Sequence, residues 1–150
     1  MNDETAIANL VHRYAELIDT GDYGGVGQLF EHGAIRVEQG GAITAVGGRA
    51  EVQAFYERHT RRFPDSGTPK TKHLTTNLII EVEGDASTAT CRSYFTVLQA
   101  CDGLPLQPII AGRYHDSFER FGGIWRFADR IIHTDLVGDL RHHLLGDPLT

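Results

Sequence analysis

The apolar and polar positions of residues 3–18 repeat with the period of an α-helix. Asn2 or Asp3 stands where an N-cap would lie, and Gly21-Asp22 follows as a helix-breaking pair. The pattern therefore predicts an amphipathic helix over residues 3–18, whose apolar stripe consists of Ile7, Leu10, Val11, Tyr14, Leu17 and Ile18.

Two further helices and a hairpin are predicted in the first half of the chain. A short helix is expected from Tyr23 to Phe30, although glycines weaken it. Two short apolar runs separated by Gly40-Gly41 predict a hairpin over residues 34–46. A longer helix is predicted over residues 49–62, with one face made of Val52, Phe55, Tyr56 and His59.

The second half of the chain consists of long runs rich in β-branched and aromatic residues. Glu83-Gly84-Asp85 and Phe121-Gly122-Gly123 are turn signals between these runs. Because the runs are longer than average strands, the sheet that they form should be strongly curved. The tail, residues 136–150, contains leucines and is expected to form a flap or a short helix. The predicted strands are residues 72–82, 87–100, 108–120 and 124–135.

Helices followed by a long antiparallel meander indicate an α+β fold, in which the helices cover one face of the sheet. A curved sheet that is closed by helices leaves a conical cavity, and cavities of this kind are the usual sites for small ligands. The 150 residues are expected to form a single domain, because a chain of this length can bury one sufficient core.

Composition and charge argue against several classes of function. The net charge of −6 disfavours a nucleic-acid surface, which relies on clustered Lys and Arg. No apolar run approaches the roughly 20 residues that span a bilayer, and the N-terminus lacks a signal-peptide pattern, so a cytoplasmic protein without a membrane partner is expected. Cys91 and Cys101 are expected to be reduced packing residues. Because the histidines, including the adjacent His142 and His143, lack zinc-ligand spacing, no dedicated metal site is expected. No Gly-rich phosphate loop is present, and no cofactor is expected.

The candidate chemistry centres on His73, an imidazole at the start of the run 72–82, where a turn residue or a solvated charge is more usual. Imidazoles ionise near neutral pH, so a neutral His73 could accept a proton from a substrate. Such a base needs an acceptor for its other ring nitrogen, and Asp19, at the end of the first predicted helix, could be that acceptor. The residues leave an alternative open, in which Asp19 caps a turn over residues 20–22 and His73 is solvated.

Tyr14 and Arg130 are two further candidates. The Tyr14 phenol could polarise a carbonyl or leaving-group oxygen as a weak acid, although it fits the apolar stripe equally well as a core residue. Arg130 lies in the run 124–135, where strand alternation separates it from Trp125 and Phe127. The face with Trp125 and Phe127 is mostly apolar, so Arg130 could as well lie on the solvent side. Both faces of a curved sheet can be partly covered, so the pattern does not decide its position.

Short motifs distributed along most of the chain occur in a distinctive order. They are Arg13-Tyr14-Ala15, Asp19-x-Gly21-Asp22, Leu29-Phe30, Gly47, Lys72-His73, Asn77, Ala111-Gly112-Arg113-Tyr114, Trp125-Arg126-Phe127 and Arg130. Their order and spacing resemble the SnoaL-like branch of the nuclear transport factor 2-like superfamily, over a core of about residues 4–135. The resemblance implies a cone-shaped α+β fold and a homo-oligomer, dimer or trimer, that packs sheet against sheet.

Within this superfamily the chain is similar to the lyases scytalone dehydratase, hexachlorocyclohexane dehydrochlorinase and bile-acid 7α-dehydratase. The resemblance implies a catalytic pair of His73 and Asp19, with Tyr14 and Arg130 at positions that are also functional. It therefore implies a cofactor-independent, dehydratase-like lyase in which His73 abstracts a proton from a small apolar cyclic molecule. One departure is that the second pocket histidine of scytalone dehydratase has no counterpart between His73 and His115.

Two other functions remain compatible with the residues. The first is a polyketide cyclase or a ketosteroid-type isomerase that uses the same cone. The second is a non-catalytic subunit, similar to the β subunit of ring-hydroxylating dioxygenases. A shared fold does not decide among these functions, because unrelated activities occur on one architecture.

Overall fold

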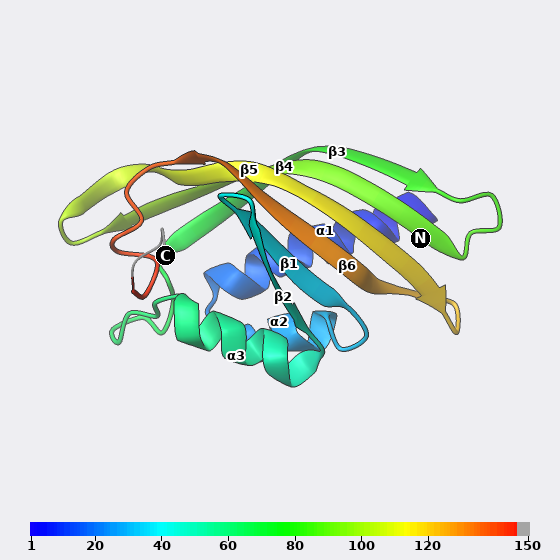
Figure 1. Ribbon diagram of the computed structural model, residues 1–150, viewed down its shortest axis with the longest axis horizontal. Helices are drawn as coiled ribbons and strands as arrows, with labels where there is room; N and C mark the ends of the chain where they lie inside the picture. Colours follow the sequence, from blue (N-terminus) through cyan, green and yellow to red (C-terminus); the bar gives the residue numbers. More distant parts are fainter. Residues whose placement is uncertain (147–150) are drawn as a thin grey trace.

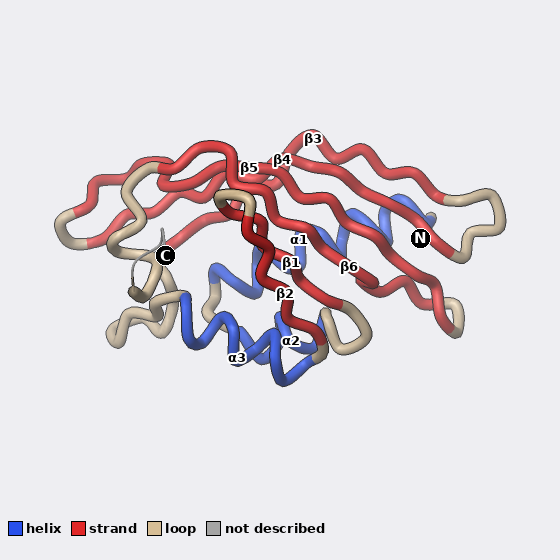
Figure 2. Tube along the Cα trace, viewed as in Figure 1, coloured by secondary structure: helices blue, strands red, loops and turns tan. Residues whose placement is uncertain are grey.

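A strongly curved sheet forms one layer of the protein, and helices lie against its concave side (Figure 1). The computed structural model describes residues 1–146. Figure 2 shows the helices gathered below the arch of strands. The elements follow the chain in the order α1 (Asp3–Asp19), α2 (Tyr23–Leu29), β1 (Ala34–Gln39), β2 (Ala42–Gly47), α3 (Arg49–His59), β3 (Thr71–Val82), β4 (Thr88–Cys101), β5 (Leu104–Phe121) and β6 (Ile124–Val137).

The strands lie in the order β2-β1-β6-β5-β4-β3. Strands β3 to β6 form an antiparallel meander, and β1 and β2 form an antiparallel hairpin, both as predicted. The hairpin joins the meander through a parallel pairing of β1 with β6, in which Ala34 lies opposite Asp129. This junction was not predicted, because the two strands are far apart in sequence and pairing between distant strands leaves no local signal.

Helix α1 packs against β3 and ends beside the first residues of that strand. The Asn2 side chain caps α1 by accepting a hydrogen bond from the Thr5 backbone N–H at 2.8 Å. Gly21 follows the helix with a φ of 75°, and a Cβ at this position would lie 2.2 Å from the Gly67 carbonyl oxygen. Only glycine fits this turn, which ends α1 at Asp19 and leaves the carboxylate next to β3.

An extra residue in β6 changes which side chains face the core. Ser117 pairs with Asp129 whereas Phe118 pairs with Phe127, so Ala128 is the additional residue of a β-bulge. As a result Phe127 and Arg130 are both fully buried. The simple alternation that placed them on opposite faces was wrong here, because a bulge shifts the side-chain direction by one residue.

Three predicted boundaries or shapes differ from the structure. The third helix ends at His59 rather than at residue 62, because Thr60 is extended and pairs with Leu144 in an isolated bridge. The strand predicted from residue 108 begins at Leu104. Residues 138–146 form turns and that bridge, and no helix occurs in this part of the described chain. We call residues 138–146 the C-terminal segment; residues 147–150 of the predicted tail lie outside the described residues.

The hydrophobic core lies between the helices and the concave side of the sheet. Val11 of α1, Phe30 after α2 and Val52 of α3 are fully buried against the strands. Phe30 stacks on Phe127 of β6 with ring centroids 4.6 Å apart. Each such large apolar side chain contributes about 1.5–3 kcal/mol of burial free energy, and together they hold the helices on the sheet. Within residues 1–146 no helix is long and apolar enough to cross a membrane.

Candidate functional site

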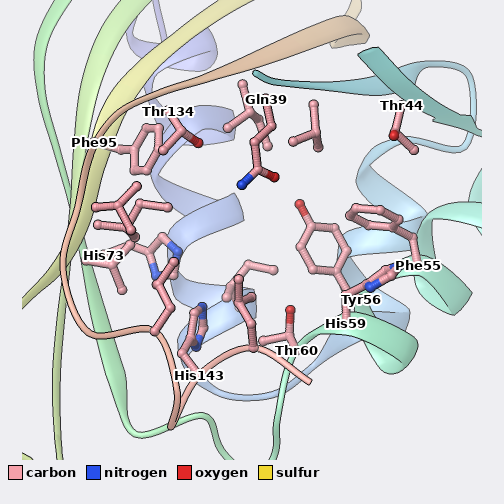
Figure 3. Close-up of a pocket in the computed structure, with 18 of the residues that line it drawn as sticks. Gln39, Thr44, Phe55, Tyr56, His59, Thr60, His73, Phe95, Thr134 and His143 are labelled. Atoms are coloured by element: carbon pink, nitrogen blue, oxygen red, sulfur yellow. The ribbon is translucent and has the colours of Figure 1, made fainter. Parts of the chain in front are cut away.

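A cavity of about 270 Å³ lies between the concave side of the sheet, α1, α3 and the C-terminal segment (Figure 3). Its volume is near the lower end of the range for small-molecule sites. Strand residues such as Phe95, Val97 and Ile110 give it an apolar wall, and Leu140 and Leu144 close it from the C-terminal segment. The cavity therefore suits a small molecule that is mostly apolar.

His73 and Asp19 form a hydrogen-bonded pair at this cavity. The Asp19 Oδ1 atom lies 2.6 Å from His73 Nδ1, and Asp19 Oδ2 accepts a hydrogen bond from the His73 backbone N–H at 2.8 Å. The Thr71 hydroxyl donates to Asp19 Oδ1 at 2.8 Å. The two side chains are only 7% and 8% exposed, so water competes weakly for these bonds. Asp19 at the end of α1 is thus satisfied by three donors from β3, which offset the unfavourable end of the helix dipole.

The charge of Asp19 determines how His73 can act. Burial alone would raise the pKa of Asp19, but the hydrogen bonds and the charge of His73 lower it below its usual value. An ionised Asp19 can only accept, so the His73 Nδ1 atom carries the hydrogen and donates it. In the neutral form of the ring, the other nitrogen, Nε2, is then the acceptor, on a side chain that lines the cavity.

Tyr14 reaches the same cavity from α1. Its hydroxyl forms a short hydrogen bond with the hydroxyl of Tyr56 from α3, and both residues line the cavity. The Tyr14 ring lies edge-on to the His73 ring, with centroids 6.4 Å apart. Burial raises the pKa of both phenols, so both stay protonated at neutral pH. Tyr14 is therefore both a buried packing residue and a lining group with a polar end.

Arg130 lies behind these tyrosines and not in the cavity wall of the described residues. It is fully buried and forms a two-pronged ion pair with Asp116, at 2.7 and 2.9 Å. Its guanidinium carbon lies 3.7 Å from the Tyr114 ring centroid and 4.3 Å from that of Tyr14. Although burial opposes the charged form, the Asp116 carboxylate raises the pKa of Arg130, so the cation is retained. Arg130 therefore contacts the aromatic rings that line the cavity.

The SnoaL-like domain is the family model that matches this chain, over residues 1–131. The chain belongs to the SnoaL-like domain family. No curated protein matches the sequence of this SnoaL-like domain.

Solved structures similar to this SnoaL-like domain share its architecture. A nuclear transport factor 2-like protein with a cystatin-like fold from Novosphingobium aromaticivorans is 25% identical, with a TM-score of 0.72, over 88% of this chain and 81% of that one. A protein provisionally named as a scytalone dehydratase, from the same organism, is 20% identical, with a TM-score of 0.71, over 91% and 87%. LinA is 20% identical, with a TM-score of 0.69, over 97% and 94%. These similarities establish the fold.

His143 of this SnoaL-like domain was not considered as a site residue from the sequence. It belongs to the C-terminal segment, is only 7% exposed and lines the cavity near His73 (Figure 3). Burial first, and the neighbouring His73 second, lower the pKa of His143 to about 4. The sequence carries only a weak signal for this position, in that His143 lies among Leu140, Leu144 and Leu145.

Further polar groups of the cavity come from several elements, including Gln39 of β1 and Thr44 of β2. Tyr56, His59 and Thr60 come from α3 and the residue after it, and Thr134 comes from β6. Figure 3 shows these side chains facing the cavity from opposite walls. Within residues 1–146 no group of three or more His, Cys, Asp or Glu side chains is arranged to hold a metal ion. The His73–Asp19 pair and the phenols that line the cavity are groups capable of proton transfer and hydrogen bonding.

Proposed function

We propose that this SnoaL-like domain is a cofactor-independent lyase of the dehydratase type, acting on a small apolar cyclic molecule. The observation that carries the proposal is the contact of His73 Nδ1 with Asp19 at 2.6 Å beside an apolar cavity. A buried carboxylate that fixes an imidazole in one tautomer is the arrangement that a general base requires. Positioned base catalysis contributes on the order of 10²–10⁴-fold to the rate of proton transfer.

The proposed reaction begins when His73 Nε2 takes a proton from a carbon next to a carbonyl group. The C–H electron pair of the substrate forms a double bond to the carbonyl carbon, the C=O π electrons move to the oxygen, and negative charge develops there. The resulting imidazolium is stabilised by Asp19. The hydroxyl on the neighbouring carbon then leaves, taking the proton from His73 to form water, and a carbon–carbon double bond remains. The base is thereby restored to its neutral form, and no external reactant is consumed.

The hydroxyls of Tyr14 and Tyr56 are suited to the developing negative charge. The pair shares two hydroxyl hydrogens, of which one bonds the two oxygens to each other and the other is available to a ligand oxygen. Donors that are already oriented toward a developing oxyanion lower its energy without reorganisation. Arg130 acts in this proposal through Tyr14, because it contacts the face of the Tyr14 ring. Its positive charge attracts electron density of the ring and makes the Tyr14 hydroxyl a better hydrogen-bond donor.

The comparisons support a related enzymatic function for the same cone. The structural neighbours include LinA and the protein provisionally named as a scytalone dehydratase. The resemblance of the sequence motifs to those of the lyases implies functional roles for Asp19, His73 and Tyr14, which agrees with a lyase assignment. Isomerisation or cyclisation on the same residues is the alternative, because proton abstraction next to a carbonyl begins these reactions as well.

The test uses a panel of cyclic β-hydroxy ketones with the purified chain. We expect product formation with the loss of one water, and a decrease of about 10²–10⁴-fold in His73→Ala while the circular dichroism spectrum is retained. The matched control is His12→Ala, because His12 is exposed on α1 and should leave turnover unchanged. A product of unchanged mass would indicate the isomerase, and an unchanged rate in His73→Ala would refute the lyase.

We also propose that the chain self-associates through the convex face of the sheet. Leu74, Tyr94 and Leu136 point to this face and are 45%, 54% and 69% exposed. Exposed apolar clusters of this kind commonly mark protein interfaces. Light scattering would show a dimer or trimer, and Tyr94→Glu should shift it toward the monomer; a monomeric wild-type chain would refute the proposal.

A further inference from the structure

We propose that His143 is a second functional histidine of the cavity, which hydrogen-bonds an oxygen substituent of the ligand, and that Gln99 positions it relative to His73. The inference rests on the proposed function, in that the same cavity holds the substrate, and it narrows the substrate class. It adds a group from the C-terminal segment to a site whose proposed base and phenols come from α1, α3 and β3.

The first observation is the unused hydrogen-bonding capacity of His143. Its side chain is more than nine-tenths buried and lines the cavity, yet the Nδ1 atom has no hydrogen-bond partner among the described residues. Leaving a buried polar atom unpaired is unfavourable, and such atoms usually have a partner. The backbone of His143 is, in contrast, fully engaged: its N–H donates to the Leu140 carbonyl, and its carbonyl accepts from the Arg61 N–H at 2.8 Å. The unused capacity therefore lies on the side chain, which lines the cavity.

The second observation concerns charge around the two imidazoles. Burial, with His73 nearby, lowers the pKa of His143, so its ring is neutral when His73 acts as a base. A neutral imidazole offers one donor and one acceptor, and as a donor it can polarise a carbonyl oxygen. It also avoids placing a second positive charge beside the imidazolium that forms on His73. The two histidines thus have different roles: His73 accepts the proton, and His143 hydrogen-bonds the ligand oxygen.

The third observation is a single side-chain amide that ties both histidines together. Gln99 of β4 is 1% exposed, and its Nε2 atom donates to the Pro69 carbonyl and to the His142 carbonyl, each at 3.0 Å. Pro69 lies on the chain leading into His73, and His142 directly precedes His143. Because both hydrogens of one amide are used, the two backbone segments are held at a fixed separation. Gln99 is therefore a positioning residue.

These observations define a ligand with two requirements. It needs an acidic C–H bond for His73 and an oxygen, as hydroxyl or carbonyl, for His143, while the rest of the molecule contacts Phe95, Val97 and Ile110. An oxygenated cyclic molecule fulfils both requirements. A purely halogenated hydrocarbon does not, because it offers His143 no strong hydrogen-bonding atom.

The test compares binding of 2-naphthol and naphthalene, which differ by one hydroxyl, to the full chain. We expect the wild-type protein to prefer 2-naphthol, and His143→Phe to weaken 2-naphthol binding by about 3–10-fold while naphthalene binding is unchanged, since one net hydrogen bond is lost. In ¹⁵N spectra of the imidazoles, the His143 signals should move with 2-naphthol but not with naphthalene. The matched control is His142→Phe, whose side chain is not among the described lining residues.

Gln99→Met tests the positioning role through the ligand preference and the His143 imidazole signals, which a merely structural role of Gln99 would not change. It removes both amide donors at similar volume, and we expect loss of the preference for 2-naphthol and altered His143 imidazole signals, while the His73 signals remain as in the wild type. Equal affinity of the wild-type chain for both probes, or an equal effect of His143→Phe on both, would overturn the inference. These binding experiments need no turnover, so their failure is distinguishable from failure of the lyase, which is decided by His73→Ala.

Discussion

Asp19 holds His73 through two different groups of that residue, its backbone N–H and its ring Nδ1. The first bond fixes where β3 begins relative to α1, and the second fixes the orientation of the imidazole. A change at Asp19 therefore affects both the position of the strand and the tautomer of the base. This double attachment explains why an acid at the end of a helix and a histidine at the start of a strand can act as one unit.

Replacement of Asp19 by Asn should change the tautomer of His73. The Asn amide has one acceptor oxygen in place of two, and the His73 backbone N–H, which can only donate, requires that oxygen. The NH₂ group would then face His73 Nδ1 and favour the hydrogen on Nε2. We expect turnover to fall by about 10²–10⁴-fold with the fold retained. Measurement of ¹⁵N shifts of the His73 ring checks the tautomer directly. Asp85→Asn, in the exposed turn after β3, is the control, and an unaltered His73 spectrum in Asp19→Asn would contradict the assignment.

The hydroxyl pair of Tyr14 and Tyr56 should show coupling in stability. Either Tyr14→Phe or Tyr56→Phe removes one hydroxyl and leaves the other without that partner, which should cost about 1–3 kcal/mol. The double variant should cost less than the sum of the two, because neither hydroxyl is then left unpaired. Urea unfolding of the four proteins measures the difference, and strict additivity would show that the bond contributes nothing.

Arg130 and Asp116 should stabilise the fold mainly by neutralising each other's buried charge. Arg130→Met leaves a buried carboxylate without its cation, and we expect a loss of about 3–5 kcal/mol in the free energy of unfolding. The double variant Arg130→Met/Asp116→Leu should recover most of this loss, since no buried charge remains. Urea unfolding tests both, and turnover of the stable double variant shows how much Arg130 matters for activity. A single Arg130→Met variant as stable as the wild type would contradict the prediction.

His143 should make the protein less stable as the solution becomes mildly acidic. Its pKa is about 4 in the folded protein, against 6.5 for an ordinary imidazole, so the unfolded chain binds more protons between these values. Stability must then fall as the pH decreases from about 6.5 to about 4, by at most about 3 kcal/mol, and this contribution is constant below that window. Asp19, with its lowered pKa, acts in the same direction only at lower pH.

Unfolding of wild type and His143→Phe, measured between pH 4 and pH 7, tests this dependence. The variant should lose the part of the slope that His143 provides, whereas His142→Phe should keep it. Equal slopes for wild type and His143→Phe would show that the pKa of His143 is not lowered by folding.

The elements that the sequence predicts well are those with a local pattern. The first helix, the hairpin and the long strands each carry their own periodicity or turn, and their bounds shift by few residues except at Leu104. The pair of Asp19 and His73 could be predicted because both residues lie at the ends of such elements. Asp19 lies at the end of α1 and His73 near the start of β3, in the order in which their motifs occur along the chain.

The features that were missed depend on contacts between distant parts of the chain. The Ala128 bulge turns Arg130 inward, and no single-strand pattern records an extra residue that is defined by pairing with β5. The parallel pairing of β1 with β6 and the approach of His143 to His73 are likewise products of tertiary packing. Residues in a short irregular segment carry no period, so their burial could not be derived from sequence alone.

The placement of the C-terminal segment divides the site along the sequence. The base, its carboxylate and the two phenols all come from residues 14–73, whereas Leu140, His143 and Leu144 come from one continuous segment that follows the last strand. In the proposed reaction, the proton-transfer groups thus lie in the first half of the chain, whereas the histidine proposed to bind the ligand oxygen lies in the C-terminal segment. Exchanging the C-terminal segment as a cassette between homologous domains should transfer ligand preference while the proton-transfer machinery is kept.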